Sequence, residues 1–112
     1  MLLLNYFRYQ HKPVRPSNIE AVLLENPDVL ECLAYGKHCD VNIEVPAALI
    51  VLRPESQTSL KDILVKANAK LPENSQLRGG LKSVKSLPRN HNGKLLRNKI
   101  DQALIVLDSV DF

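Results

Sequence analysis

Apolar and polar positions along the first quarter of the chain predict a hairpin followed by a helix. The stretch "LLNYFRYQ" holds aromatic and apolar strand formers, and "HKPVRPS" follows it with two prolines. This pattern predicts a short strand or hairpin. "IEAVLLEN" then places Ile19, Val22 and Leu23 on one helical face. That predicted helix ends at Asn26, because Pro27 disfavours helical geometry at the residue before it.

Two strand-like runs come next. "VLECLAYG" alternates two sets of side chains, and we expect a strand buried mainly on the face of Leu30, Cys32 and Ala34. "KHCDVNIE" is polar and predicts a loop. "VPAALIVLRP" is a continuous apolar run of strand length bounded by prolines, which predicts a central strand covered on both faces. A short polar loop between consecutive strands indicates an antiparallel pair.

The second half predicts two more helices and one more strand. Ser59 can cap a helix in "SLKDILVKANAKL", whose apolar residues share one face. "LKSVKSLP" alternates irregularly and predicts an edge strand, and "KLLRNKIDQALIVL" (94–107) predicts a last helix. The predicted fold class is therefore α+β: a small antiparallel or mixed sheet of about three strands, flanked by helices, with an N-terminal β-hairpin.

Length and charge set the limits of the functional interpretation. The chain has 112 residues, 45% of them hydrophobic, and a formal net charge of +3. We expect one globular domain, with a hairpin at 1–15, a core at 16–106 and a tail at 107–112. Between Leu77 and Lys99 there are many Lys and Arg and no Asp or Glu. A nucleic-acid binder is one alternative, but without interleaved aromatics or a known motif we expect no nucleic-acid partner.

The two cysteines and the chain ends indicate an intracellular, most simply cytoplasmic, protein. Cys32 lies in an apolar run, where a buried free thiol is usual, and Cys39 gives no zinc-type spacing. We expect neither a metal site nor a disulfide. No run reaches the roughly 20 apolar residues that span a bilayer. "MLLLNYFRY" is too short for a signal-peptide core, and "DSVDF" is not a peroxisomal signal.

The order of these pieces resembles the C-terminal domain of the adenylate-forming superfamily, which contains acyl-CoA synthetases, insect luciferases and peptide-synthetase adenylation domains. The resemblance covers roughly residues 5 to 106, and "LPRNHNGKLLR" is its most specific piece. "LRGG" at 77–80 is similar to luciferases and luciferase-like acyl-CoA synthetases. Such enzymes join a carboxylate to the α-phosphate of ATP, releasing pyrophosphate. A thiol, usually coenzyme A, then displaces AMP.

The resemblance implies roles for six residues. In this family the domain swings over a larger N-terminal domain, so that a Gly-Lys loop enters the active site in one pose and the N-terminal hairpin in the other. The resemblance implies that Lys94 is the lysine that acts in the adenylation step and that Gly93 allows the loop to bend. The hairpin residues implied to face coenzyme A are Arg8, Tyr9, His11 and Lys12. Residues 1–4 stand where the family has its hinge.

The chemistry suits a lysine at position 94. A carboxylate and a triphosphate repel each other, and charge builds on the α-phosphate during attack, so a positioned ammonium group stabilises both the approach and the transition state. Lysine is a flexible point charge, whereas arginine favours one fork geometry. The alternative is an exposed lysine after the Asn92-Gly93 turn. His91 is expected to be an exposed loop residue rather than an acid or base.

The implied substrates and partners lie largely outside this chain. The resemblance implies ATP, with Mg bound through it, coenzyme A and a carboxylic acid in the intact enzyme, together with a large N-terminal adenylation domain in cis or in trans. No Gly-rich phosphate loop is present, so we expect the isolated chain to hold no cofactor and to be inactive alone. The alternative is a non-catalytic interaction or regulatory module derived from such an ATP-dependent acid–thiol ligase.

Overall fold

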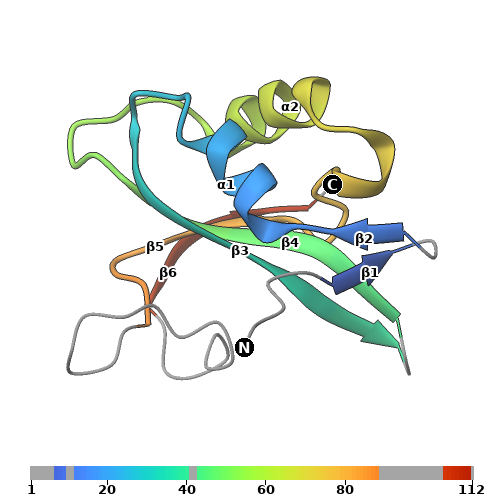
Figure 1. The fold of residues 1–112 in the computed structure, drawn as a ribbon. Coiled ribbons are helices and arrows are strands. Elements are labelled where there is room, and N and C mark those ends of the chain that lie inside the picture. Colours follow the sequence, from blue (N-terminus) through green and yellow to red (C-terminus); the bar gives the residue numbers. More distant parts are fainter. Residues whose placement is uncertain (1–6, 10–11, 41–42, 89–104, 112) are drawn as a thin grey trace.

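The computed structural model describes residues 7–9, 12–40, 43–88 and 105–111. Two strands form a separate antiparallel hairpin, and four strands form a mixed sheet in the order β3-β4-β5-β6 (Figure 1). The fold class is α+β, as predicted. In chain order the elements are β1 (Phe7–Tyr9), β2 (Lys12–Val14), α1 (Pro16–Leu23), β3 (Val29–Asp40), β4 (Ile43–Leu52), α2 (Leu60–Lys70), the 3₁₀ turn η1 (Glu73–Ser75), β5 (Leu81–Val84) and β6 (Val106–Val110).

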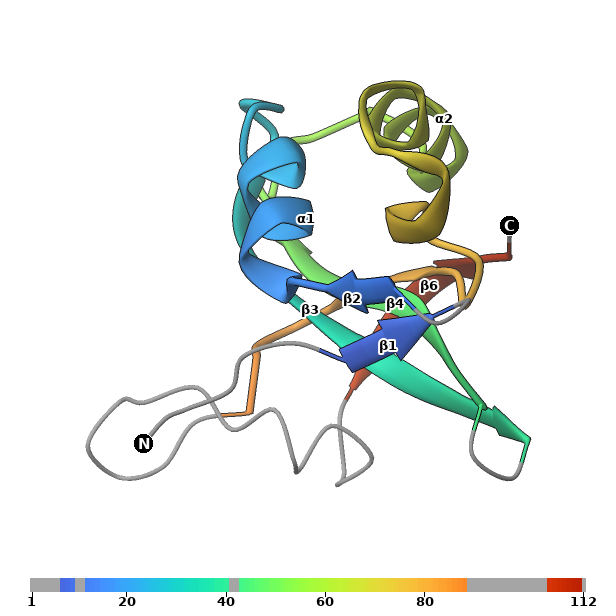
Figure 2. The ribbon, with the colours of Figure 1, turned by 45° about the vertical axis from the view of Figure 1, so that its right-hand side comes forward.

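Both helices lie on one face of the four-stranded sheet (Figures 1 and 2). The main core fills the space between this face and the helices, with Ile19, Ile50 and Leu81 fully buried in it. We call the opposite side of the sheet the second face. It carries a smaller buried cluster, consisting of Leu33, Leu49, Val84 and Leu87, with Tyr35 and Val51 packed against it. The sheet is therefore buried on both sides at its centre.

Helix α1 begins three residues earlier than its apolar pattern predicts, at Pro16 instead of Ile19. Proline is well suited to the first turn, since its missing N–H would have no helical partner there and its φ angle is already helical. The helix ends at Leu23, three residues before the predicted end at Asn26, and a turn follows it. In this turn the Asn26 side chain accepts a hydrogen bond from the Asp28 N–H at 2.9 Å. The Asn-Pro-Asp sequence thus belongs to the turn that leads into β3.

Helix α2 matches its prediction closely. Its N-cap is Ser59, whose hydroxyl oxygen accepts a hydrogen bond from the backbone N–H of Asp62 at 3.1 Å. The predicted apolar residues Leu60, Ile63 and Leu64 are buried against the sheet. Helix α2 therefore has its first turn fixed by a side-chain cap and one side fixed by the core.

Replacing Ser59 by Ala should lower the free energy of unfolding by about 1 kcal/mol, because one N–H of the first turn then loses its side-chain acceptor. Urea denaturation of the folded chain, followed by circular dichroism, measures this change. The matched control is Ser17→Ala, since Ser17 is an exposed serine in the first turn of α1 where no side chain caps the helix. Equal losses in the two variants would contradict a capping role for Ser59.

The predicted polar loop at 37–44 is wrong, because most of it is strand. β3 runs on to Asp40 and β4 begins at Ile43, with Lys37 opposite Val45 and His38 opposite Glu44. Backbone hydrogen bonds form the ladder whatever the polarity of the side chains, so an exposed hairpin extension can carry polar residues. The predicted antiparallel pairing of the two strands is confirmed.

Burial along β3 also differs from the expectation. Cys32 and Ala34 are buried as predicted, but Leu30 is 43% exposed and Leu33, on the other face, is fully buried. The middle of β3 is covered on both sides, which an alternation pattern read from one strand cannot show. β4 is the predicted central strand, paired with β3 on one side and β5 on the other, and residues 45–50 are all buried.

The C-terminal part of the prediction needs two corrections. First, β5 is not an edge strand, because β6 pairs with it in antiparallel fashion. Second, the predicted helix at 94–107 does not include Val106 and Leu107, which belong to β6, and most of the expected tail at 107–112 is the rest of this strand. Residues 94–104 lie outside the described residues. The branched run in "LIVL" favours a strand once β5 offers a free edge, and it raises the sheet from about three strands to four.

Candidate functional site

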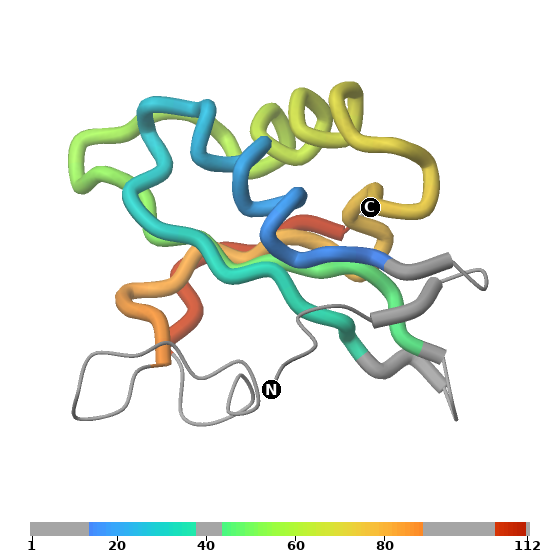
Figure 3. Tube along the Cα trace, viewed as in Figure 1, coloured from blue at the N-terminus to red at the C-terminus, as the bar shows by residue number. Residues whose placement is uncertain are grey.

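The ends of β5 and β6 define where the segment containing Lys94 leaves and rejoins the sheet. Leu87 is buried in the second-face cluster. The Lys85 N–H donates a hydrogen bond to the Ile105 carbonyl oxygen at 3.1 Å. The chain therefore departs and returns at adjacent points (Figure 3). Gly93 and Lys94 are between these two anchors in the sequence but lie outside the described residues, as does His91.

The second predicted site, the N-terminal hairpin, is present as β1 and β2. Arg8 is opposite Pro13, and Tyr9 is opposite Lys12. The side chains of these residues, and His11 as a whole, lie outside the described part, so their predicted contact with coenzyme A stays a prediction. In Figure 1 the hairpin lies toward one end of the strands of the sheet, and the ends of β5 and β6 that flank the Lys94 segment lie toward the other. The two predicted sites are thus on separate parts of the domain.

Two lysines that the sequence analysis did not single out lie on the second face. Lys82 is in register with Leu49, which is in register with Leu33, so all three share this face. Lys37 is four residues beyond Leu33 on the same strand and therefore also lies on it. Its ammonium group contacts the Gly79 carbonyl oxygen at 3.5 Å.

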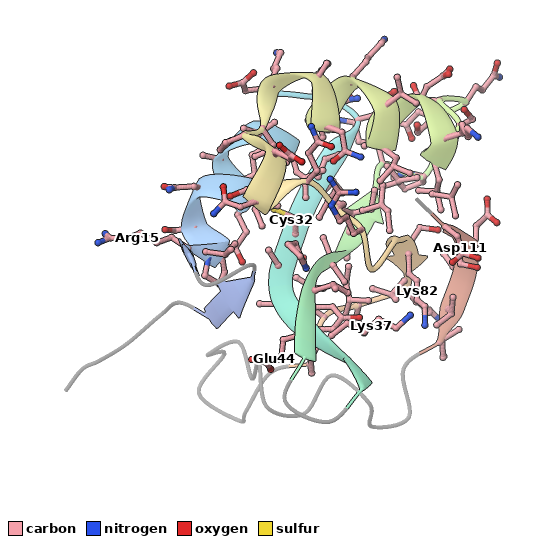
Figure 4. The ribbon with its side chains drawn as sticks, turned by 90° about the vertical axis from the view of Figure 1, so that its right-hand side faces the viewer. Arg15, Cys32, Lys37, Glu44, Lys82 and Asp111 are labelled. Atoms are coloured by element: carbon pink, nitrogen blue, oxygen red, sulfur yellow. The ribbon has the colours of Figure 1, made fainter. Side chains whose placement is uncertain are left out.

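Figure 4 shows Lys37 and Lys82 pointing into the same region. The second face, on which Leu87 anchors the Lys94 segment, therefore carries two lysines. It also carries the carboxylate of Glu31, which is in register with Val51. The sequence contained a signal for Lys82: in a strand over "LKSV", residues 82 and 84 share one face, so a buried Val84 places Lys82 beside the apolar cluster. Lys37 could not have been found in this way, because its segment was predicted to be a loop.

The "LRGG" segment serves the packing of the fold. A Cβ atom on Gly79 would come within 2.9 Å of the Ala47 Cβ and 3.0 Å of the Pro46 carbonyl oxygen. Gly80 has φ of +94°, and a Cβ atom there would come within 2.8 Å of the Val110 carbonyl oxygen. The two glycines let the chain pass close to β4 and then to the end of β6.

An open cleft of about 370 Å³ lies between α1 and α2, on the helical side of the molecule. Polar and charged groups line much of it, and an ion pair between Lys70 and Glu25 at 2.6 Å joins its two walls. Thr58 donates a hydrogen bond to the Asp28 carboxylate at its edge. The cleft is across the sheet from Leu87, so it does not adjoin the anchors of the Lys94 segment.

The described residues contain no group of three or more His, Cys, Asp or Glu that could hold a metal ion. Cys32 is buried, as predicted, and its Sγ contacts the Glu20 carbonyl oxygen at 3.5 Å. Within the part of the chain that the structure describes, neither α1 nor α2 is long and apolar enough to cross a membrane.

These features define a small α+β domain in which a basic segment is held at both ends by a mixed sheet. Residues 18–94 match the family described as the AMP-binding enzyme C-terminal domain. The chain belongs to this family, and the match extends to Lys94. The expected relationship to adenylate-forming enzymes is confirmed.

The curated relatives include luciferases and CoA ligases. The chain is 30% identical over 103 residues to luciferin 4-monooxygenase from Photinus pyralis, covering 92% of this chain and 19% of that protein. It is 30% identical over 87 residues to probable 4-coumarate–CoA ligase 1 from Dictyostelium discoideum, covering 78% of this chain and 16% of that protein. The chain therefore spans about a fifth of the length of these relatives.

Solved structures show the same fold. The TM-score is 0.76 to an anthranilate CoA ligase in complex with anthranoyl-AMP, at 26% identity, covering 90% of this chain and 20% of that one. It is 0.75 to o-succinylbenzoate CoA synthetase from Bacillus subtilis in complex with AMP, at 26% identity, covering 88% of this chain and 20% of that one. The matched part is in each case a small fraction of a larger enzyme.

Proposed function

We propose that this chain is the mobile C-terminal domain of an ATP-dependent carboxylate–CoA ligase and that it supplies Lys94 to the adenylation step. One observation carries the proposal: the family match extends to Lys94, and the chain on both sides of this lysine is fixed to the sheet. Leu87 is buried on one side, and Ile105 is hydrogen-bonded to Lys85 on the other. A segment attached to a rigid sheet in this way loses little conformational entropy when it places one side chain in the active site of a separate domain.

The role of Lys94 follows from the charges of the reactants. The carboxylate of the substrate attacks the α-phosphorus of ATP, an acyl–phosphate bond forms and pyrophosphate leaves. An ammonium group at the reacting phosphate offsets the negative charge that builds there. Lys37 and Lys82 add positive potential on the face where Leu87 anchors the segment, and such a field draws anions towards it.

For the second half-reaction, we propose that the hairpin replaces the Lys94 segment at the active site. Arg8, Tyr9, His11 and Lys12 would then lie along the path of coenzyme A, whose thiol attacks the acyl carbonyl and releases AMP. The separation of the hairpin from the ends of β5 and β6 supports this division, since one domain can present either side by rotating (Figure 1).

The substrates and partners follow from the same proposal. ATP and coenzyme A would bind the intact enzyme, with Mg held by the phosphates of ATP, and the acid would bind to the large N-terminal domain. Solved relatives are described in complex with AMP, and with ATP and a magnesium ion. We propose an intracellular, cytoplasmic location, where ATP and coenzyme A are available.

The isolated chain should form no acyl-adenylate, because a few cations on one face cannot hold ATP and an acid in reactive geometry. The measurement is acid-dependent exchange of labelled pyrophosphate into ATP. We expect no exchange with the pure chain or with a related N-terminal domain alone, and exchange when the two are fused. Exchange catalysed by the pure chain would contradict the first part of this prediction.

The fusion also distinguishes the non-catalytic alternative. A regulatory or interaction module would leave the N-terminal domain without adenylation activity even when the fusion is folded. Thermal unfolding of the fusion, followed by circular dichroism, verifies that both domains are folded before activity is compared.

A further inference from the structure

The start of β6 exposes three consecutive large apolar side chains. Ile105, Val106 and Leu107 are 58%, 47% and 65% exposed. We call these three residues the β6 patch. The other large exposed apolar residues in the described part of the chain are single positions elsewhere in the fold: Leu24, Leu30 and Val65. Several large apolar side chains exposed next to one another in the chain mark a contact with another body more often than a scattered leucine does.

We propose that the β6 patch is the surface on which the large N-terminal domain rests when Lys94 is in the active site. This inference rests on the proposed function and adds the contact residues of one pose. The chain spans about a fifth of its relatives, so most of the protein mass that could cover the patch lies in the large domain. Ile105 is itself the C-terminal anchor of the Lys94 segment. A domain that receives Lys94 must come close to that anchor.

The geometry of β6 favours side-chain contact over the addition of another strand. The pairing with β5 has an irregularity that leaves Leu107 without a partner between Val106 and Asp108. Such bulges twist an edge and redirect a side chain. In addition, the Asp108 carboxylate accepts the Ser109 N–H at 2.9 Å, which occupies a donor that a further strand would use.

The bulge at Leu107 and the Asp108–Ser109 hydrogen bond argue against a second copy of the chain paired along the same edge. Both are devices by which edge strands avoid pairing. At the other edge of the sheet, Glu20 on α1 accepts the Ala34 N–H of β3 at 2.9 Å, which occupies one donor of that edge. What β6 still offers to a partner is apolar surface, with the exposed charges of Lys85 and Asp108 beside it. An apolar centre with a charged rim is the usual composition of a domain interface.

The test uses the fusion of this chain to a related N-terminal domain, with Leu107→Ser as the variant. Because Leu107 is largely exposed, the change should leave the fold intact. We expect adenylation to slow about tenfold, as for the loss of one apolar interface contact. Thioester formation from ready-made acyl-adenylate should be unchanged. The matched control is Val65→Ser, a similarly exposed apolar residue (56%) on α2, on the helical side of the sheet, and it should affect neither step.

A second measurement does not depend on turnover. Amide hydrogen exchange at residues 105–107 of the fusion should slow at least about tenfold when a non-reactive acyl-adenylate analogue holds the adenylation pose, because a covering domain suppresses local opening. Unchanged exchange, or equal effects of Leu107→Ser and Val65→Ser, would overturn the inference. So would concentration-dependent self-association of the isolated chain that Leu107→Ser abolishes. If Lys94→Ala has no effect, the proposed function fails as well, whereas a Lys94 effect without a Leu107 effect removes the patch alone.

Discussion

Adenylation by the fusion enzyme should slow roughly 10²–10³-fold when Lys94 is replaced by Ala, because the change removes one preorganised positive group from the developing charge. The loss should appear in the rate of acyl-adenylate formation at saturating ATP and acid, since the cation acts mainly on the transition state. Pre-steady-state measurement of pyrophosphate release gives this rate. The thioester-forming step, started from ready-made acyl-adenylate, should change far less.

Arg8→Ala provides the reciprocal control for this experiment. The hairpin is far from the Lys94 anchors, so Arg8→Ala should slow thioester formation and leave adenylation nearly unchanged. Lys61→Ala serves as the charge-matched control, since Lys61 is an exposed lysine on α2, on the helical side of the sheet. If Lys94→Ala leaves adenylation within a few-fold of the unmutated fusion, Lys94 is a surface lysine after a turn and the proposed function is wrong.

Gly80→Ala should lower the free energy of unfolding by about 2–3 kcal/mol, which is a large fraction of the stability of a small domain. The backbone of Gly80 has φ of +94°, which costs any residue with a Cβ atom, and the added atom would come within 2.8 Å of the Val110 carbonyl oxygen. Because the Cβ atom is fixed to the backbone and the oxygen belongs to the backbone of β6, neither can move aside as the end of a flexible side chain could.

Chemical denaturation of the isolated chain measures this loss of stability, and amide hydrogen exchange shows which elements lose protection. We expect the fastest additional exchange in β6, because the Val110 end of that strand must move away from Gly80. Ser86→Ala, at an exposed position just beyond β5, should stay within about 0.5 kcal/mol of the parent chain. A Gly80→Ala chain as stable as the Ser86→Ala chain would contradict a packing role for "LRGG".

The elements that the sequence predicted well have local signals. Ser59 caps α2, Asn26-Pro27 lies in the turn after α1, and the apolar run of β4 marks the centre of the sheet. Each follows from the chemistry of a few adjacent residues. The polar end of the β3–β4 hairpin and the strand β6 have no such signal. His38 and Glu44 pair because the backbones of β3 and β4 meet, and Val106 becomes strand because β5 has a free edge.

The candidate site divides in the same way. Lys94 could be proposed from its motif, since the Gly-Lys pair and the basic residues after it are adjacent in the sequence. The juxtaposition of Lys37 and Lys82 could not, because 45 positions separate them in the sequence and only the register of β3, β4 and β5 puts them on one face. The exposure of Leu107 likewise depends on an irregularity in strand pairing, which no composition pattern records.

The buried thiol of Cys32 makes the junction between α1 and β3 chemically observable. The sulfur contacts the Glu20 carbonyl oxygen of α1 from its place on β3, and only 7% of the residue is exposed. A thiol reagent can reach it only when the helix separates from the strand, so the alkylation rate under native conditions reports the population of that opened form. In a Cys39→Ser background the signal comes from Cys32 alone. Comparing the free domain with the fusion would then show whether rotation between the two poses moves the domain as a rigid body or loosens the helix that follows the hairpin.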